Sequence, residues 1–299
     1  MVALSDQIEI VTTLLVRGSK KLEIVSILGM PGLGKTTLAK KLYNDPSVRC
    51  HFHTFAWSTV SQVYNGKNLL LEILVCIVPK LSEQYAKMKE VDLVEELYKR
   101  LKRNRYLIIL DDLWDGEAWT LMEKSFPDDA NGSRILLTSR NHKVALHVGP
   151  TNKLHHLRSL TDEESWELLR KKVFHNEECP PALHELGVQI AKNCKGLPLI
   201  VIIIAGILAT REPDGWEEVA QRLSSYTVLG TEECRDILEL SYRNLPDYLQ
   251  RCLLYFGAFK EDQEIPIWRL KYLWIAEGFV QETEMKSLEA VAEEYMIDL

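Results

Sequence analysis

The first half of the chain alternates short apolar runs with stretches of helical character. The runs are rich in branched and aromatic residues, which is typical of buried strands. Four such strands are predicted, over residues 23–28, 54–60, 106–110 and 134–138. Helices are predicted over residues 35–44, 69–78 and 91–101. Because strands alternate with helices, the pattern predicts an α/β fold whose parallel sheet is covered by helices on both faces.

After about Leu160 the pattern becomes almost entirely helical. Thr161 and Glu164 have the spacing of a capping box, in which each side chain bonds to the backbone of the other residue at a helix start. Further helices are predicted over residues 163–174, 181–193, 198–210, 216–224, 251–256 and 267–277. A polar stretch around Gly230 is a candidate joint. We therefore predict three regions: an α/β domain at 1–157, a helical domain at 158–230 and a third helical region at 231–299.

One segment fits the full pattern of a phosphate-binding loop, Gly-x4-Gly-Lys-[Ser/Thr]. Its glycines, Gly29, Gly32 and Gly34, let backbone N–H groups turn inward around a phosphate. The helix that begins near Lys35 directs its positive dipole end at the same anion. Lys35 adds a charge for the β- and γ-phosphates, and Thr36 offers its hydroxyl to Mg²⁺. The sequence therefore predicts a site for ADP or ATP.

Two carboxylates follow the strand predicted at 106–110. Asp111 and Asp112 come directly after this apolar run, so a buried strand would deliver both at its exposed end. Beside a phosphate loop, Asp111 would hold the Mg²⁺ shell, and Asp112 would orient or deprotonate the attacking water. Asp111 and Asp112 are thus the predicted catalytic pair, and Thr36 and Asp111 are the predicted metal ligands.

The strand predicted at 134–138 ends in hydroxyl side chains and Arg140. An arginine at the carboxyl end of a parallel strand near the phosphates can sense a γ-phosphate through charge-assisted hydrogen bonds. A solvated surface arginine would show the same spacing. The residues alone leave both interpretations open.

Composition narrows the functional class. The chain of 299 residues has a formal net charge of −7, and residues 231–299 alone carry −8, which disfavours binding to nucleic acid. The longest apolar run, residues 197–208, is too short to span a bilayer. No signal-peptide pattern opens the chain, and the six cysteines form no C-x-x-C pair. We therefore expect reduced, mostly buried thiols in a cytoplasmic protein without a membrane span.

The histidines do not form a metal site by spacing. His51 and His53 are predicted to alternate along a strand, and the adjacent His155 and His156 are predicted to face apart. No acidic or cysteine partner completes either pair, so Mg²⁺ is the one metal ion predicted.

Taken in order, the motifs resemble the NB-ARC domain of plant NLR (nucleotide-binding leucine-rich-repeat) disease resistance proteins, a branch of the STAND class of P-loop ATPases. The likeness covers nearly the whole chain. Trp114 and the pattern from Trp57 to Gln62 resemble the coiled-coil subclass rather than the TIR subclass. The residues that carry it are the P-loop at 29–37, Phe55-Ala56-Trp57 with Val60-Ser61-Gln62, Leu110-Asp111-Asp112-Leu113-Trp114, Gly132-Ser133-Arg134 with Arg140, Gly196-Leu197-Pro198-Leu199, and Cys252-Leu253-Leu254-Tyr255 with Ala276-Glu277-Gly278-Phe279.

The resemblance implies a P-loop NTPase sheet, then a helical domain, then a winged-helix domain. It also implies an immune-receptor switch that holds ADP at rest, exchanges it for ATP and then assembles into a homo-oligomer. Thr37 would join the nucleotide contacts, Pro198 would pack on the adenine, and Arg140 would contact the γ-phosphate. From the residues alone, Pro198 is only a helix start.

The chain also departs from the family pattern. The family's MHD motif is missing, because Met296-Ile297-Asp298 lies too soon after Gly278-Phe279. We therefore expect a truncated winged helix at 231–299, and neither the coiled-coil head nor the leucine-rich repeats. The leading prediction is a switch with slow ATP hydrolysis at most. Two rivals remain: an actively hydrolysing AAA+-like ATPase with Asp112 as its acid, and a non-hydrolysing scaffold that keeps ADP.

Overall fold

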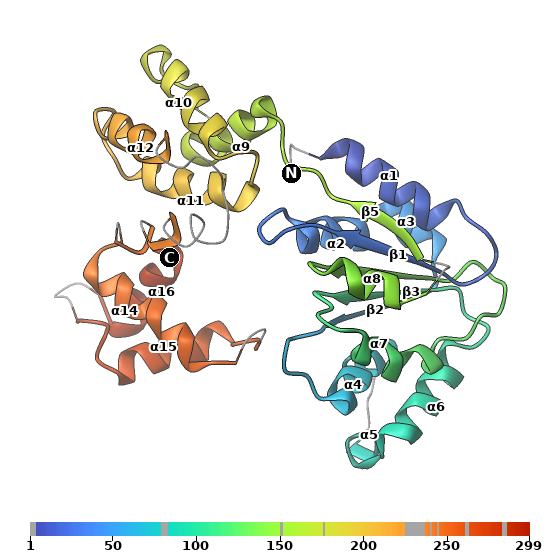
Figure 1. The fold of residues 1–299 in the computed structure, drawn as a ribbon. Helices are drawn as coiled ribbons and strands as arrows, with labels where there is room; N and C mark the ends of the chain where they lie inside the picture. Colours follow the sequence, from blue (N-terminus) through green and yellow to red (C-terminus); the bar gives the residue numbers. More distant parts are fainter. Residues whose placement is uncertain are drawn as a thin grey trace. The chain divides into compact units, whose positions relative to one another are not determined.

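The computed structural model describes residues 4–78, 83–149, 152–175, 177–224, 237–239, 241–243, 245–260, 263–282 and 286–299. The chain divides into two compact units, residues 1–168 with 195–199 and residues 169–194 with 200–299. The first unit holds the sheet and the predicted phosphate loop, and the second is helical (Figure 1). The division into three regions stays a prediction.

The first unit is built on a five-stranded sheet of order β2-β3-β4-β1-β5, in which every described pairing is parallel. The strands are β1 (Glu23–Leu28), β2 (Thr54–Thr59), β3 (Tyr106–Asp111), β4 (Arg134–Ser139) and β5 (Asn152–His156). The four predicted strands are confirmed. The register pairs Leu28 with Ser139 and Thr59 with Asp111, so these strand ends lie together at the carboxyl edge of the sheet.

Strand β5 was not predicted, because its sequence Asn-Lys-Leu-His-His has no apolar run. In the described part of the chain it is an edge strand, and it pairs with β1. An edge strand can carry polar and charged side chains, since one of its sides is not covered by a neighbouring strand.

Helices cover both faces of the sheet, as predicted (Figure 1). Strand residues alternate between the two faces, so Ile108 and Leu110 join a core with the second group of helices, while Leu107 and Ile109 are buried against the first. The first group is α1 (Ser5–Val16), α2 (Lys35–Tyr43) and α3 (Pro46–His51). The second is α4 (Gly66–Ile77), α6 (Glu90–Leu101), α7 (Gly116–Met122) and α8 (His142–His147), with the short α5 (Glu83–Lys87) and the 3₁₀ turn η1 (Glu123–Ser125).

The capping box at Thr161 and Glu164 is confirmed at the start of α9 (Asp162–Phe174). The Glu164 N–H donates to Thr161 Oγ1 at 3.2 Å, and the Thr161 N–H donates to Glu164 Oε2 at 2.8 Å. Helices α10 (Pro181–Asn193), α11 (Pro198–Ala209) and α12 (Gly215–Ser224) follow, and the later elements are α14 (Asp247–Tyr255), η2 (Phe256–Ala258), α15 (Ile267–Ala276) and α16 (Leu288–Asp298). Trp274 is fully buried in the core of α14, α15 and α16.

Two expectations from the sequence are wrong. His51 ends helix α3 rather than lying on a strand with His53, because Asp45 caps that helix and Pro46 starts it. Of the described cysteines only Cys194 and Cys252 are buried. Gly230 and Cys234 lie outside the described residues. Within the part of the chain that is described, no helix is long and apolar enough to cross a membrane.

Candidate functional site

The predicted phosphate loop connects β1 to helix α2. Gly34 caps α2 with a φ of 92° and forms no side-chain capping bond, so the first-turn N–H groups are left to bind an anion. Gly32 has a φ of 79°, and a Cβ there would lie 2.9 Å from Cβ of Leu199. Both features require glycine at position 32. The Leu199 N–H donates to the Gly32 carbonyl at 3.2 Å.

Lys35 is folded back onto its own loop. Its Nζ donates to the carbonyl oxygens of Gly29 at 2.8 Å and Met30 at 3.1 Å, and the residue is only 6% exposed. Burial lowers the pKa of Lys35, and the nearby carboxylates of Asp112 and Asp111 offset part of this. A buried ammonium beside a helix N-terminus is arranged to neutralise a phosphate group.

Asp111 is the centre of a buried cluster of oxygen atoms. Its Oδ1 accepts from the hydroxyl of Thr36 at 3.0 Å and from that of Thr138 at 2.6 Å. Burial raises the pKa of Asp111, although both hydroxyl bonds oppose this change. Mg²⁺ binds through carboxylate and hydroxyl oxygens, so Thr36 and Asp111 fit this ion.

Thr138 was not predicted as a site residue. Its hydroxyl donates to Asp111 and accepts from the backbone N–H of Asp112 at 2.8 Å. It thereby orients both predicted acids. The available sequence signal was the pair of hydroxyl side chains that end β4, but only the register of β3 and β4 places Thr138 beside Asp111.

Arg140 is exposed and forms an ion pair with Asp112. Its Nη2 and Nε donate to the two carboxylate oxygens of Asp112 at 2.8 and 3.2 Å, and its guanidinium lies 4.5 Å from the ring centre of Trp114. Asp112 itself has a positive φ of 54°, a conformation that Asp adopts more readily than most residues. The structure therefore joins the predicted general base to the predicted γ-phosphate sensor.

The site as a whole gathers two cations and two anions at the carboxyl edge of the sheet. Lys35, Asp111, Asp112 and Arg140 follow or end three adjacent strands and act on one another electrostatically. Pro198 is the first residue of α11, as the residue pattern predicted, and the bond from Leu199 to Gly32 places it beside the loop. The structure thus brings Lys35, Thr36, Asp111, Asp112 and Arg140 together, while Thr37 is in the first turn of α2.

Replacing Asp111 with asparagine is expected to stabilise the protein at neutral pH in the absence of nucleotide. The folded state raises the pKa of this carboxyl, so its ionised form lowers the free energy of unfolding above that pKa, and stability returns as pH falls. Asparagine keeps the acceptor oxygen for both threonines without the charge. We expect a gain of about 1 kcal/mol at neutral pH in urea unfolding.

The pH dependence distinguishes this effect from a change in packing. The difference between Asp111→Asn and wild type should shrink as the pH is lowered, because the wild-type carboxyl takes up its proton. Asp92→Asn, at an exposed position of α6, is the matched control and should leave stability unchanged. A loss of stability in Asp111→Asn that is independent of pH would show that the buried charge is not costly.

Two protein-family models match this chain. The family model described as "NB-ARC domain" matches residues 4–179. The chain belongs to the NB-ARC family. A second model, "Disease resistance protein Winged helix domain", matches residues 258–299.

The NB-ARC relatives are disease resistance proteins. A late blight resistance protein homolog of Solanum demissum is 44% identical over 301 residues, which cover 100% of this chain and 23% of the relative. A late blight resistance protein of the same plant is 43% identical, again over 100% of this chain and 23% of its own length. This NB-ARC chain therefore spans about a quarter of the length of its curated relatives.

Solved structures support the same fold for this NB-ARC chain. A STAND protein with a tetratricopeptide repeat sensor from Pyrococcus horikoshii superposes with a TM-score of 0.62 at 17% identity, covering 97% of this chain and 38% of that one. The ORC2 protein of Aeropyrum pernix, solved as ADPNP and ADP complexes, has a TM-score of 0.56 at 15% identity, with coverage of 100% and 94%. At these identities the likeness shows the fold alone.

Proposed function

We propose that this chain is the nucleotide-operated switch of a plant disease resistance protein, which holds ADP at rest and exchanges it for ATP. The observation that carries the proposal is the bidentate pair of Asp112 and Arg140 beside the loop lysine. It joins the group that would activate water, Asp112, to the group that would sense the γ-phosphate, Arg140. A γ-phosphate that draws Arg140 away would therefore change the state of Asp112, and a switch needs a part that responds to the γ-phosphate in this way.

Each loop residue has a distinct part in holding the nucleotide. The first-turn N–H groups and Lys35 bind the phosphates, and Lys35 exchanges its bonds to the Gly29 and Met30 carbonyls for bonds to phosphate oxygens. Thr36 and Asp111 hold Mg²⁺, which neutralises phosphate charge when bound. Pro198 packs on the adenine, while Gly29, Gly32, Gly34 and Thr37 complete the loop.

The pair of Asp112 and Arg140 also accounts for slow hydrolysis. Both carboxylate oxygens of Asp112 accept from the guanidinium, so the pair must open before either oxygen can bond to an attacking water. Arg140 must leave Asp112 to reach a γ-phosphate, and this frees the carboxylate at the same step. Hydrolysis is thereby limited by the exchange of partners, which favours a switch over a rapid motor.

The chain acts with other parts of a longer receptor in this proposal, since its relatives are about four times its length. A coiled-coil head, leucine-rich repeats and further copies of the chain are its proposed partners, and the cytoplasm is its proposed location. The proposal includes no nucleic-acid partner and no membrane span.

The test is to identify the nucleotide that purifies with the chain and to measure ATP turnover. We expect bound ADP at close to one per chain and slow turnover. Asp112→Asn should still bind ATP and should lower the turnover on the order of a hundredfold, because it removes the base. Asp92→Asn is the matched control and should match wild type in both respects.

The rival functions give different results in the same experiment. Empty sites with rapid turnover would indicate a motor ATPase. Permanently bound ADP that does not exchange with ATP would indicate a scaffold. A chain that neither contains nor binds adenine nucleotide would refute the proposed switch.

A further inference from the structure

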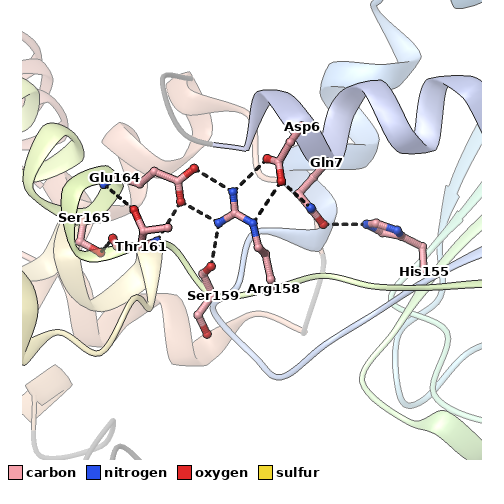
Figure 2. A network of polar contacts seen from close by, with 8 residues as sticks. All are labelled: Asp6, Gln7, His155, Arg158, Ser159, Thr161, Glu164 and Ser165. Carbon is pink, nitrogen blue, oxygen red and sulfur yellow. Dashed lines mark hydrogen bonds and ion pairs between the residues drawn. The ribbon is translucent and has the colours of Figure 1, made fainter.

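Arg158 lies between the carboxylates of Asp6 and Glu164 (Figure 2). Its Nη2 and Nε donate to Asp6 at 2.9 and 3.2 Å, and its Nη1 and Nη2 donate to Glu164 at 2.7 and 2.9 Å. A fifth bond runs from Nη1 to the Ser159 carbonyl at 2.9 Å. The guanidinium thus uses all five of its N–H donors, which a lysine could not do.

This arrangement, here called the Arg158 clasp, joins the start of the chain to residues 158 and 164, which lie more than 150 positions further along it. Asp6 belongs to the first turn of α1, Arg158 follows β5, and Glu164 belongs to the first turn of α9. Glu164 also accepts from the Thr161 N–H at 2.8 Å. The clasp therefore links the first turn of α1 to the first turn of α9.

The α1 end of the clasp is anchored to the sheet. The amide nitrogen of Gln7 donates to Asp6 Oδ2 at 2.9 Å, and its amide oxygen lies 2.9 Å from Nε2 of His155 on β5 (Figure 2). Burial lowers the pKa of His155, which favours the neutral imidazole. Asp6 is thus held in place from both sides, by Gln7 and by Arg158.

The segment that carries Arg158 also contacts the phosphate loop at its start. The Leu157 N–H donates to the Leu28 carbonyl at 2.8 Å, and a Cβ at Gly29 would lie 3.6 Å from the Leu157 carbonyl oxygen. Leu28 and Gly29 lead directly into the loop. Residues 157–160 therefore run alongside its first residues.

The other end of this segment holds the loop that carries Pro198. The Leu160 N–H donates to the Gly196 carbonyl at 2.9 Å, and Gly196 has a φ of 69° and no room for a Cβ against the Leu160 carbonyl. Leu199, which directly follows Pro198, donates its N–H to the carbonyl of Gly32 in the phosphate loop. The contacts close a ring from Gly29 through residues 157–160 and 196–199 back to Gly32.

We propose that Arg158 is a positioning residue for nucleotide retention. The clasp holds residues 157–160 in place, and these residues set the position of Pro198 relative to the phosphate loop. This inference rests on the proposed function, because Pro198 is taken as the adenine contact. Without Arg158, Asp6 and Glu164 repel each other, the ring loosens on the adenine side, and the phosphate loop with Lys35 keeps its own bonds.

The experiment follows the release of a fluorescent ADP from the whole chain after addition of excess unlabelled ADP. Arg158→Gln and Glu164→Gln are each expected to speed release about tenfold, since each breaks a bidentate, partly exposed ion pair. The double variant should release no faster than Arg158→Gln alone, because both changes break the same contact. Higher salt should narrow the difference between wild type and Arg158→Gln.

Competition by inorganic pyrophosphate separates positioning from a general loss of structure. Pyrophosphate has no base, so its affinity should be the same in wild type and Arg158→Gln. Arg100→Gln, which breaks an ion pair with Glu96 on the surface of α6, is the matched control and should not alter release. Arg158→Lys keeps the positive charge but has fewer N–H donors, so its rate of ADP release should lie between those of wild type and Arg158→Gln. It replaces Arg158→Gln in the experiment if that variant does not fold.

Each result decides between the two proposals. Suppose that wild type binds fluorescent ADP and that Arg158→Gln and Arg158→Lys release it at the wild-type rate. The positioning role of Arg158 would then be wrong, and the proposed switch would be unaffected. An equal loss of ADP and pyrophosphate affinity would also overturn the positioning role, because the effect would then not be confined to the adenine side. Wild type that does not bind ADP at all would overturn the proposed function itself.

Discussion

Lys35→Ala is expected to abolish tight nucleotide binding while leaving the fold intact. The Lys35 ammonium lies at the N-terminus of α2, where it donates to the Gly29 and Met30 carbonyls, and it can turn to the phosphates of a bound nucleotide. Two charge-assisted bonds to phosphate contribute roughly 3–6 kcal/mol, so affinity should fall at least about a hundredfold. Isothermal titration with ADP and with ATP measures the loss directly.

The stability of this variant should change little, because burial already disfavours the charged lysine, as the lowered pKa of Lys35 indicates. Lys41→Ala, at an exposed position of the same helix, is the matched control and should bind as wild type does. If Lys35→Ala retained ADP at the wild-type stoichiometry, the assignment of residues 29–36 as a phosphate loop would be wrong.

Arg134→Ala is expected to cause a large loss of stability at the opposite end of the sheet. Arg134 is 1% exposed, lies 3.1 Å from the Glu23 carboxylate, and donates to the carbonyl oxygens of Lys21, Ser19 and Ser133 at 3.0, 2.9 and 2.8 Å. Removing it leaves buried acceptors without a donor and opens a cavity. We expect the free energy of unfolding to fall by about 3 kcal/mol.

Chemical denaturation measures this loss, with Arg100→Ala on the surface of α6 as the control expected to change stability by less than about 0.5 kcal/mol. In Arg134→Ala the Glu23 carboxylate keeps its bond to Lys153, which is 2.9 Å long in the wild-type structure. The expected loss of stability is therefore near the lower end of the range for a broken buried ion pair. Folded Arg134→Ala should bind nucleotide normally, because position 134 begins β4 and the site lies beyond its other end. A variant as stable as wild type would show that the pair contributes nothing net.

The sequence by itself determined the local elements and the chemistry that depends on spacing. Strands β1, β3 and β4 could be predicted because central strands of a parallel sheet are buried on both faces and form apolar runs, as 106–110 shows. Strand β2 lies at an edge of the described sheet, and it was predicted from its aromatic residues Phe55 and Trp57. The phosphate loop, the two acids after β3 and the capping box at Thr161 depend on residues within a few positions of one another. Such patterns fix local geometry before any tertiary contact forms.

Only the tertiary structure decided which distant groups meet. The polar edge strand β5 has no apolar run, so its place beside β1 follows from the sheet and not from its own residues. The pairs of Arg140 with Asp112 and of Arg158 with Asp6 join residues that are 28 and 152 positions apart. Charge patterns carry no period that reports such pairs. Strand order and register bring Arg140 to Asp112, because the folded sheet aligns the carboxyl ends of its strands at one edge. The packing of α1 beside β1 brings Asp6 to Arg158, which follows the neighbouring strand β5.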